Sequence, residues 1–169
     1  MNLQRLFLTF LGSGLSPVAP GTVGTLVAMP FGYLVIYFLG VNTLTTFVIV
    51  FSVIAIFEIN KFENNGGEHD DKSIVIDEVV GVWLTMAITY GGAFAIYNSE
   101  YTFYIAGVLS FLSFRLFDIW KPSTIGYIDK KVKGGLGVIG DDLLAGFAAG
   151  VLNLLIFKIV AYLSLNGYF

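Results

Sequence analysis

The stretch from Leu6 to Phe57 reads LFLTFLGSGLSPVAPGTVGTLVAMPFGYLVIYFLGVNTLTTFVIVFSVIAIF, and it decides the fold. It contains no Lys, Arg, Asp or Glu, and it is more than twice the ~20 residues that a helix needs to cross a hydrocarbon core. Two membrane spans and a turn therefore fit within it. In the whole chain, 56% of the 169 residues are hydrophobic and only 12% are charged. Because so few polar groups are available to cover a soluble surface, we expect lipid to surround most of the chain.

Five segments are long and apolar enough to be spanning helices. They are expected at residues 23–39, 43–59, 74–97, 101–120 and 141–165, with loops at 41–42, 60–73, 98–100 and 121–140. The sequence therefore predicts an all-α, polytopic membrane helix bundle that forms one domain over residues 1–169, with a Gly/Pro-rich segment near its N-terminus. A four-span bundle, or a reentrant first segment broken at Pro30, is the alternative.

The basic residues predict an orientation in the membrane. Those that fall on the N-terminal side, once five spans are counted, are Arg5, Lys61, Lys72, Lys121, Lys130, Lys131 and Lys133. Because cytoplasmic loops carry an excess of Lys and Arg, the N-terminus is expected in the cytoplasm and the C-terminus outside. Arg115 lies near the same boundary. Lys158 departs from the pattern toward the outer end of the last span, where its long side chain can reach the interface.

Composition disfavours several classes of function. The absence of cysteine removes disulfides, thiolate metal sites and cysteine-nucleophile chemistry. A net charge of -3 gives no reason to expect nucleic acid as a partner. The chain begins like a signal peptide, but Pro17 and Pro20 crowd the small-residue cleavage position, so we expect the N-terminus to be retained. The single histidine, His69, lies in a polar loop and is a weak candidate for catalysis.

Charged side chains near a span are costly in so apolar a chain, so each one needs a reason. Three clusters begin or end spans: Asp77 with Glu78, then Arg115 with Asp118 and Lys121, then Asp141 with Asp142. In the predicted orientation all three lie within a turn or two of the cytoplasmic interface, so their side chains can meet. Helix capping is the structural alternative for one residue of each acidic pair.

Five carboxylates at one depth repel one another unless cations lie between them. A hard divalent ion suits oxygen ligands of this kind, so we expect Mg²⁺, with Mn²⁺ as a substitute. Arg115, Asp118 and Lys121 recur at three-residue spacing, which predicts either a binding face or a ladder of salt bridges on one helix.

Glycine-rich stretches have functional and structural interpretations. The segment Gly12-Ser-Gly-Leu-Ser-Pro-Val-Ala-Pro-Gly-Thr-Val-Gly24 precedes a long apolar helix, with Thr22 at the expected N-cap. Its backbone amides either form a cradle for a phosphate or belong to a capped turn. Gly146 and Gly150 form a small-residue stripe, which we expect to serve helix packing. The GxGxxG spacing at residues 135–140 is not interpreted as a dinucleotide site, because no strand precedes it.

Four ordered motifs carry a resemblance to a known family. They are Ala19-Pro-Gly-Thr-Val-Gly24, Ile74-Val-Ile-Asp-Glu-Val-Val-Gly81, Phe114-Arg-Leu-Phe-Asp-Ile-Trp-Lys-Pro122 and Gly134-Gly-Leu-Gly-Val-Ile-Gly-Asp-Asp-Leu-Leu-Ala-Gly146. Together they resemble the phosphatidylglycerophosphatase A family over nearly the whole chain. The resemblance implies Mg²⁺-dependent hydrolysis of phosphatidylglycerophosphate to phosphatidylglycerol and inorganic phosphate in a bacterial inner membrane. Ser123 and Thr124, where many members have Trp-Pro, and Gly140, where an aliphatic residue is usual, depart from the pattern and bear on loop conformation and head-group fit.

The implied reaction suggests roles for the charged residues. Glu78, Asp141 and Asp142 are the predicted metal ligands; Asp77 and Asp118 are predicted to orient or deprotonate water; Thr22, Arg115 and Lys121 are predicted to hold phosphate oxygens. An aspartate that accepts the phosphoryl group is the alternative mechanism. The phospholipid substrate is expected to keep its acyl chains in the bilayer. Lys130, Lys131 and Lys133 either attract anionic head groups or only mark the cytoplasmic side.

Two other functions compete with this one. A small transporter or channel would use the charged residues as an ion path, but the charges cluster at one interface and no inverted repeat is evident. Transfer of a phosphoalcohol from a CDP-linked donor would need that enzyme family's spaced Asp-Gly and Ala-Arg motif, which the sequence lacks. The sequence predicts no oligomeric state.

Overall fold

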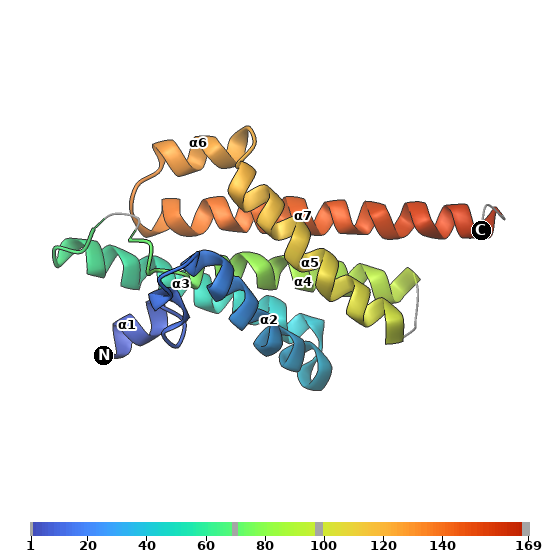
Figure 1. The fold of residues 1–169 in the computed structure, drawn as a ribbon, viewed down its shortest axis with the longest axis horizontal. Coiled ribbons are helices and arrows are strands. Elements are labelled where there is room, and N and C mark those ends of the chain that lie inside the picture. The colour runs from blue at the N-terminus through green and yellow to red at the C-terminus, as the bar shows by residue number, and fades with distance from the viewer. Residues whose placement is uncertain (1, 69–70, 97–99, 167–169) are drawn as a thin grey trace.

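The computed structural model describes residues 2–68, 71–96 and 100–166, and every regular element in these ranges is a helix (Figure 1). The helices are α1 (Leu3–Leu8), the 3-10 turn η1 (Ser13–Leu15), α2 (Pro20–Leu39), α3 (Val41–Asn64), α4 (Ile76–Ile96), α5 (Glu100–Trp120), α6 (Thr124–Lys131) and α7 (Gly134–Leu165). The predicted all-α class is therefore confirmed.

Five of the helices, α2, α3, α4, α5 and α7, are long and apolar enough to cross a membrane. Pro30 lies inside α2, which continues without a break to Leu39, so neither a four-span bundle nor a broken first segment is observed. Large apolar side chains cover the outside of the bundle; Phe38 and Phe57, for example, are 71% and 69% exposed. Such a surface suits lipid and not water, so the chain is a multi-pass membrane protein.

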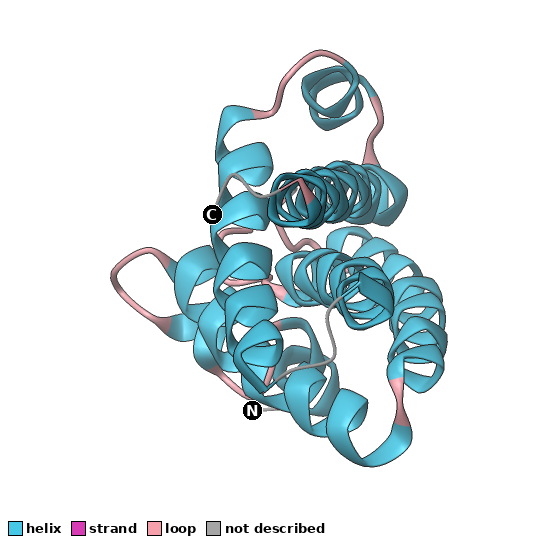
Figure 2. Ribbon diagram, turned by 90° about the vertical axis from the view of Figure 1, so that its right-hand side faces the viewer, coloured by secondary structure: helices cyan, strands magenta, loops and turns pink. Residues whose placement is uncertain are grey.

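Helix α4 lies at the centre of the bundle, in contact with α2, α3, α5 and α7. Of its most apolar stretch, 61% is buried inside the protein, against 28 to 33% in the other four long helices. Figure 2 views α7 nearly end on, with the short α6 at the edge of the molecule beside it. Residues at the N-terminus of α4 are therefore surrounded by the ends of other helices.

The contact between α4 and α7 depends on two glycines that leave no room for a side chain. A Cβ placed on Gly146 would collide with the backbone of Gly81, and the Oγ1 hydroxyl of Thr85 lies 3.1 Å from the Gly146 carbonyl oxygen that accepts its hydrogen bond. Gly150 packs equally closely on Ile88. The predicted packing role of the small-residue stripe is confirmed, and it brings the N-terminal halves of α4 and α7 together.

Two predictions near α7 were wrong. The helix begins at Gly134 and not at residue 141, and the preceding loop contains α6. Tertiary contacts make the glycine-rich start helical: Gly135 lies against the backbone of Ile56 in α3, and its N–H donates to Asn60 Oδ1 at 2.7 Å. Asp141 and Asp142 therefore lie about two turns inside α7, where they do not cap it. The predicted loop at 98–100 and His69 lie outside or at the edge of the described residues.

The N-terminal segment holds the approach to α4. Gln4 Nε2 donates to the Glu58 carbonyl at 3.0 Å, and the Val75 N–H donates to the Leu8 carbonyl at 3.0 Å. Gly14 lies directly against Ser73, where a Cβ would not fit. The last two contacts hold Ser73 and Val75, just before α4, and so position its first turn.

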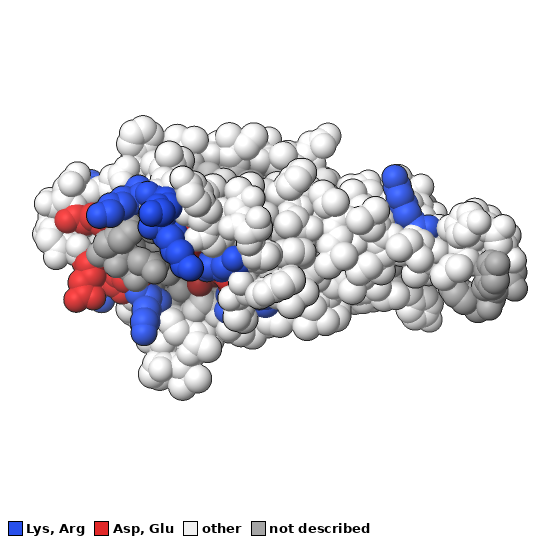
Figure 3. All heavy atoms as spheres, turned by 90° about the horizontal axis from the view of Figure 1, so that it is seen from above, with Lys and Arg blue, Asp and Glu red and all other residues white. Residues whose placement is uncertain are grey.

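The directions in which the long helices run bring the charged residues to one end of the molecule. Helices α3 and α5 end there, and α4 and α7 begin there (Figure 1). Figure 3 shows Lys, Arg, Asp and Glu side chains concentrated over this end, with a long uncharged surface beyond. Lys158, in the C-terminal half of α7, lies outside the concentration. The clusters that are separated in the sequence therefore share one end of the bundle, as predicted.

Candidate active site

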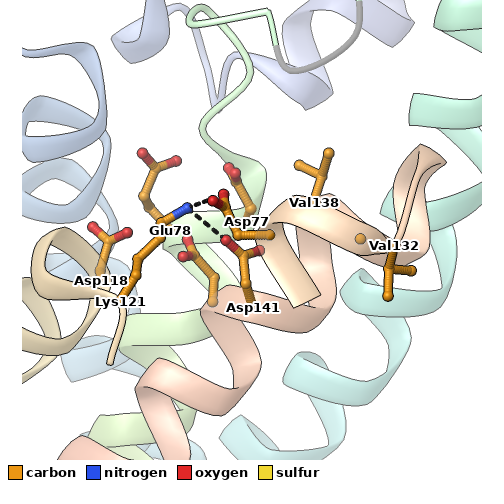
Figure 4. Close-up of a pocket in the computed structure, with 10 residues that line it drawn as sticks. Asp77, Glu78, Asp118, Lys121, Val132, Val138 and Asp141 are labelled. Atoms are coloured by element: carbon orange, nitrogen blue, oxygen red, sulfur yellow. Dashed lines mark hydrogen bonds and ion pairs between the residues drawn. The ribbon is translucent and has the colours of Figure 1, made fainter. Parts of the chain in front are cut away.

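A cavity of about 260 Å³ opens at the charged end of the bundle, between α4, α5, α6 and α7 (Figure 4). The carboxylates that line it are Asp77, Glu78, Asp118, Asp129, Asp141 and Asp142. Lys121 reaches in among them. Every acidic residue that the sequence singled out therefore lies at one cavity, although the sequence separates the first from the last by more than sixty residues.

Three of these carboxylates converge closely enough to hold a metal ion. One oxygen from each of Asp77, Glu78 and Asp142 lies within 4.8 Å of the others. Asp77 Oδ1, Glu78 Oε2 and Asp142 Oδ2 are also buried, with no hydrogen-bond partner among the described residues. A buried carboxylate oxygen without a partner is costly, and a hard divalent cation prefers such oxygens. The donor set therefore fits a cation of this kind.

The membership of this trio differs in one residue from the predicted metal ligands. Asp77 joins Glu78 and Asp142, whereas Asp141 Oδ2 accepts a 2.7 Å hydrogen bond from Lys121 Nζ. Consecutive residues on a helix point about 100° apart, so Asp141 and Asp142 cannot both face α4. Asp142 shares a face with Gly146, four residues on, and that face packs on α4.

Lys121 links α5, α6 and α7 through two ion pairs. Its Nζ lies 2.5 Å from Asp129 Oδ1 and 2.7 Å from Asp141 Oδ2, and Figure 4 marks both contacts with dashed lines. Burial lowers the pKa of Lys121, but the hydrogen bonds and charges of Asp129 and Asp141 outweigh it and raise the pKa above its usual value. The ammonium group is therefore charged at neutral pH.

The predicted ladder on α5 is only half formed. Arg115 Nη1 pairs with Asp118 Oδ2 one turn along, and both side chains are largely buried. Lys121 does not continue the ladder, because α5 ends at Trp120 and Lys121 has a φ of 44°, which turns the chain away. Positive φ is unfavourable for a residue with a Cβ, and the two ion pairs of Lys121 offset that cost.

The N-terminus of α2 faces a second cavity of about 400 Å³, which adjoins the first. Thr22 lines this cavity, but it is not the N-cap: α2 begins at Pro20, and its N-cap residue Ala19 makes no side-chain capping bond. A Cβ added to Gly21 would collide with the Glu78 carboxylate and would lie 3.5 Å from Arg115 Nη1, so the backbone of Gly21 lies close to both side chains. The positive end of the α2 dipole is thus directed at the charged site.

Sequence reasoning missed Asp129. It lies in α6, a short helix within the predicted loop, and it completes the pairing of Lys121. The signal was present in the apolar residues Ile125 and Ile128, three apart on one face, with Asp129 beside them. Glycine and lysine on both sides of this short pattern made a loop the more natural interpretation.

The fold and the site together define a multi-pass membrane protein whose candidate active site lies at the ends of its helices. No solved structure gives a significant match to the chain. The sequence does match a family, phosphatidylglycerophosphatase A, over residues 6–157. The chain belongs to this family, which confirms the resemblance inferred from the four motifs.

Several named relatives match most of the chain. Phosphatidylglycerophosphatase A of Escherichia coli K12 is 37% identical over 152 residues, covering 89% of this chain and 82% of its own. The Haemophilus influenzae protein of the same name is 35% identical over 149 residues, covering 88% of this chain and 85% of its own. A Bacteroides thetaiotaomicron protein, named as a putative phosphatidylinositol-3-phosphatase, is 36% identical over 155 residues, covering 89% of this chain and 91% of its own.

Proposed function

We propose that the chain hydrolyses the terminal phosphomonoester of phosphatidylglycerophosphate and releases phosphatidylglycerol and inorganic phosphate. The convergence of Asp77, Glu78 and Asp142 beside Lys121 carries the proposal. The names of the Escherichia coli and Haemophilus influenzae relatives support it. The name of the Bacteroides relative describes a lipid of the same chemical class, in which a phosphomonoester lies beyond a phosphodiester.

Magnesium is the cation that we assign to the converging carboxylates. Asp77, Glu78 and Asp142 would hold it, since their free oxygens are buried and close together. Asp141, a ligand by prediction, instead orients the ammonium group of Lys121. When bound, Mg²⁺ neutralises the carboxylates and stabilises the negative charge that develops on the transferring phosphoryl group. Manganese is an acceptable substitute for the same oxygen ligands.

The remaining residues bind the substrate and move a proton. Lys121 lines both cavities, so its ammonium group can donate to the oxygens of the phosphomonoester. Arg115 and the backbone amides beside Thr22 add positive charge from the adjoining cavity. Asp118 also lines both cavities, and its carboxylate accepts the proton of the attacking water.

Rapid quenching during a single turnover separates this route from the alternative with an aspartyl nucleophile. Direct attack by water leaves no phosphorylated protein at any time. If an aspartate accepts the phosphoryl group, a phosphoenzyme can be trapped by rapid quenching.

We place the reaction at the cytoplasmic face of the bacterial inner membrane. The candidate site shares its end of the bundle with nearly all the basic residues, and cytoplasmic loops are the basic ones. A site at the ends of the helices meets the lipid head group where it already lies. The acyl chains therefore stay in the bilayer, and the lipid is not extracted during the reaction.

Phosphate release by the purified protein in detergent tests the proposal. With phosphatidylglycerophosphate, we expect turnover with Mg²⁺ and none in chelator. Glu78→Gln is expected to lower kcat by about 100-fold or more, because the variant removes one of the carboxylates that would hold Mg²⁺. Glu68→Gln makes the same chemical change on an exposed side chain and serves as the matched control. Undiminished turnover in chelator, or equal losses in the two variants, would refute the proposal.

A further inference from the structure

A groove of about 590 Å³ follows the outer face of α5 toward the candidate site. Its apolar residues are Leu112, Leu116, Ile119 and Trp120, and their side chains are 57%, 52%, 72% and 68% exposed. Successive members of this set are four, three and one positions apart, which places them along one side of the helix. Arg115 is the charged member of the lining, so the groove combines a long apolar wall with one cation.

The groove and the two cavities are connected in a fixed order. Arg115 and Ile119 line both the groove and the cavity beside the α2 N-terminus. Asp77 and Glu78 line both that cavity and the carboxylate cavity. The cavity beside α2 therefore lies between the other two. A path from the lipid-facing surface meets apolar side chains first, then Arg115, and then the carboxylates.

Arg115 is positioned to receive an anion at the middle of this path. Its side chain is only 16% exposed, and its Nη1 is held by Asp118, which fixes the guanidinium plane. Its Nε is buried with no hydrogen-bond partner in the described part of the chain. Gly21, in the first turn of α2, lies beside Nη1. An unpaired donor on a fixed guanidinium, next to a helix N-terminus, suits a phosphate oxygen.

We propose that Arg115 and the first turn of α2 bind the phosphodiester of the lipid substrate, with an acyl chain lying along the α5 groove. This inference rests on the proposed function and adds a second phosphate site to it. The substrate has the same order as the path: acyl chains, phosphodiester, glycerol and terminal phosphomonoester. The two phosphates are separated by a glycerol, and the two cations line successive cavities, so Arg115 binds the first phosphate and Lys121 faces the second.

The arrangement gives selectivity between phospholipids. Phosphatidic acid carries its single phosphate directly on diacylglycerol, with no spacer. To bring that phosphate to the converging carboxylates, the lipid would have to draw its glycerol backbone past Arg115 and out of the groove. Arg115 therefore favours lipids that carry a phosphomonoester beyond a phosphodiester, and it contributes nothing specific to phosphatidic acid.

Two variants, assayed on two lipids with identical acyl chains, test the role of Arg115. Arg115→Gln is expected to lower kcat/KM for phosphatidylglycerophosphate about 10- to 100-fold more than it lowers kcat/KM for phosphatidic acid, because the first lipid also loses a charged hydrogen bond to its phosphodiester. Lys121→Gln faces the phosphomonoester, so it is expected to lower both activities in parallel. Equal losses on both lipids in Arg115→Gln would overturn the inference. A wild-type protein inactive on phosphatidylglycerophosphate would instead refute the proposed function.

Product inhibition supplies a second measurement where turnover of phosphatidic acid is too slow to compare. Phosphatidylglycerol retains the phosphodiester and acyl chains but has lost the phosphomonoester. Its inhibition constant is expected to rise about tenfold or more in Arg115→Gln and to change little in Lys121→Gln. The milder Arg115→Lys keeps the charge beside Asp118 and controls for misfolding. A rise in Lys121→Gln as large as that in Arg115→Gln would contradict the assignment.

A bulky substitution tests the groove itself. Leu116→Trp is expected to raise KM for the diacyl substrate and to leave unchanged the KM for its deacylated analogue, glycerophosphoglycerophosphate. Leu34→Trp, on the exposed face of α2, is the matched control and is expected to change neither value. If both substrates weaken equally in Leu116→Trp, the groove does not hold an acyl chain.

Discussion

The converging carboxylates predict that one substitution stabilises the protein without metal and destabilises it with metal. One oxygen from each of the three carboxylates lies within 4.8 Å of the others, and two unit charges at that separation repel by about 3.5 kcal/mol at an effective dielectric constant of about 20. Asp142→Asn removes two of the three pairs among Asp77, Glu78 and Asp142. Protonation and water entry relieve part of the repulsion, so we expect the variant to be about 1–3 kcal/mol more stable than the wild type in chelator.

Magnesium should reverse that order. A ligand at 100 times its Kd stabilises the folded state by about 2.7 kcal/mol, and only the wild type keeps the full set of ligands. The assay is thermal unfolding in detergent, followed by tryptophan fluorescence, in chelator and over a Mg²⁺ titration. Glu68→Gln, the exposed control, is expected to match the wild type in both series. If Asp142→Asn is less stable than the wild type in chelator, or gains as much from Mg²⁺, the three carboxylates do not form a cation site.

Three further predictions concern packing, charge and orientation. In a denaturation assay, Gly146→Ala is expected to lower the unfolding free energy by about 1–3 kcal/mol, because the added Cβ would collide with the Gly81 backbone. Gly91→Ala is the control, since its added Cβ would make an ordinary contact at 3.6 Å, and it is expected to be neutral or stabilising. Ion pairs raise the pKa of Lys121, so the stability that its charge contributes is lost only above its usual pKa. The difference in unfolding free energy between the wild type and Lys121→Gln should therefore stay constant from about pH 6 to about pH 9. A smaller difference within that range would contradict the pairing. A cysteine at Lys131 should react with an impermeant maleimide only in inverted vesicles, and one at Leu165 only from outside; the reverse pattern would invert the proposed orientation.

Sequence reasoning succeeded where the signal is a property of many residues. The number of spans follows from apolar runs of about twenty residues, and no local conformational choice can hide them. The shared end of the charged clusters follows from the parity of the spans. Pro30 is tolerated inside α2 because neighbouring helices and the low dielectric surroundings keep the remaining backbone hydrogen bonds intact. These features needed no knowledge of tertiary contacts.

The start of α7 could not be predicted because tertiary contacts stabilise it. Gly134, Gly135 and Gly137 are poor helix formers, so local propensity favours a loop there. The Gly135 N–H donates a hydrogen bond to Asn60 Oδ1, and Gly135 packs closely on Ile56, so contacts with α3 stabilise the start of α7. A single sequence does not show which distant residue lies beside a glycine.

The membership of Asp142, and not Asp141, in the converging trio was within reach of the sequence. Gly146 was already expected to face another helix, and a residue four positions earlier shares its face. That face contains Asp142, so Asp141 had to point elsewhere. The exchange of Asp141 for Asp77 in the converging trio follows from this rotation of α7, together with the first turn of α4.

The packing beneath the carboxylates also disfavours an ion path between α4 and α7. An ion path would have to continue from Asp142 along the interface of α4 and α7 toward the other side of the membrane. One turn below, Gly146 lies against the Gly81 backbone with no space for a methyl group. Farther along the same interface, Asn153 Nδ2 donates to Thr89 Oγ1 at 2.9 Å, and both side chains are buried. A cation that enters from the charged end therefore meets packed backbone between α4 and α7, which favours the phosphatase over an ion path along this interface.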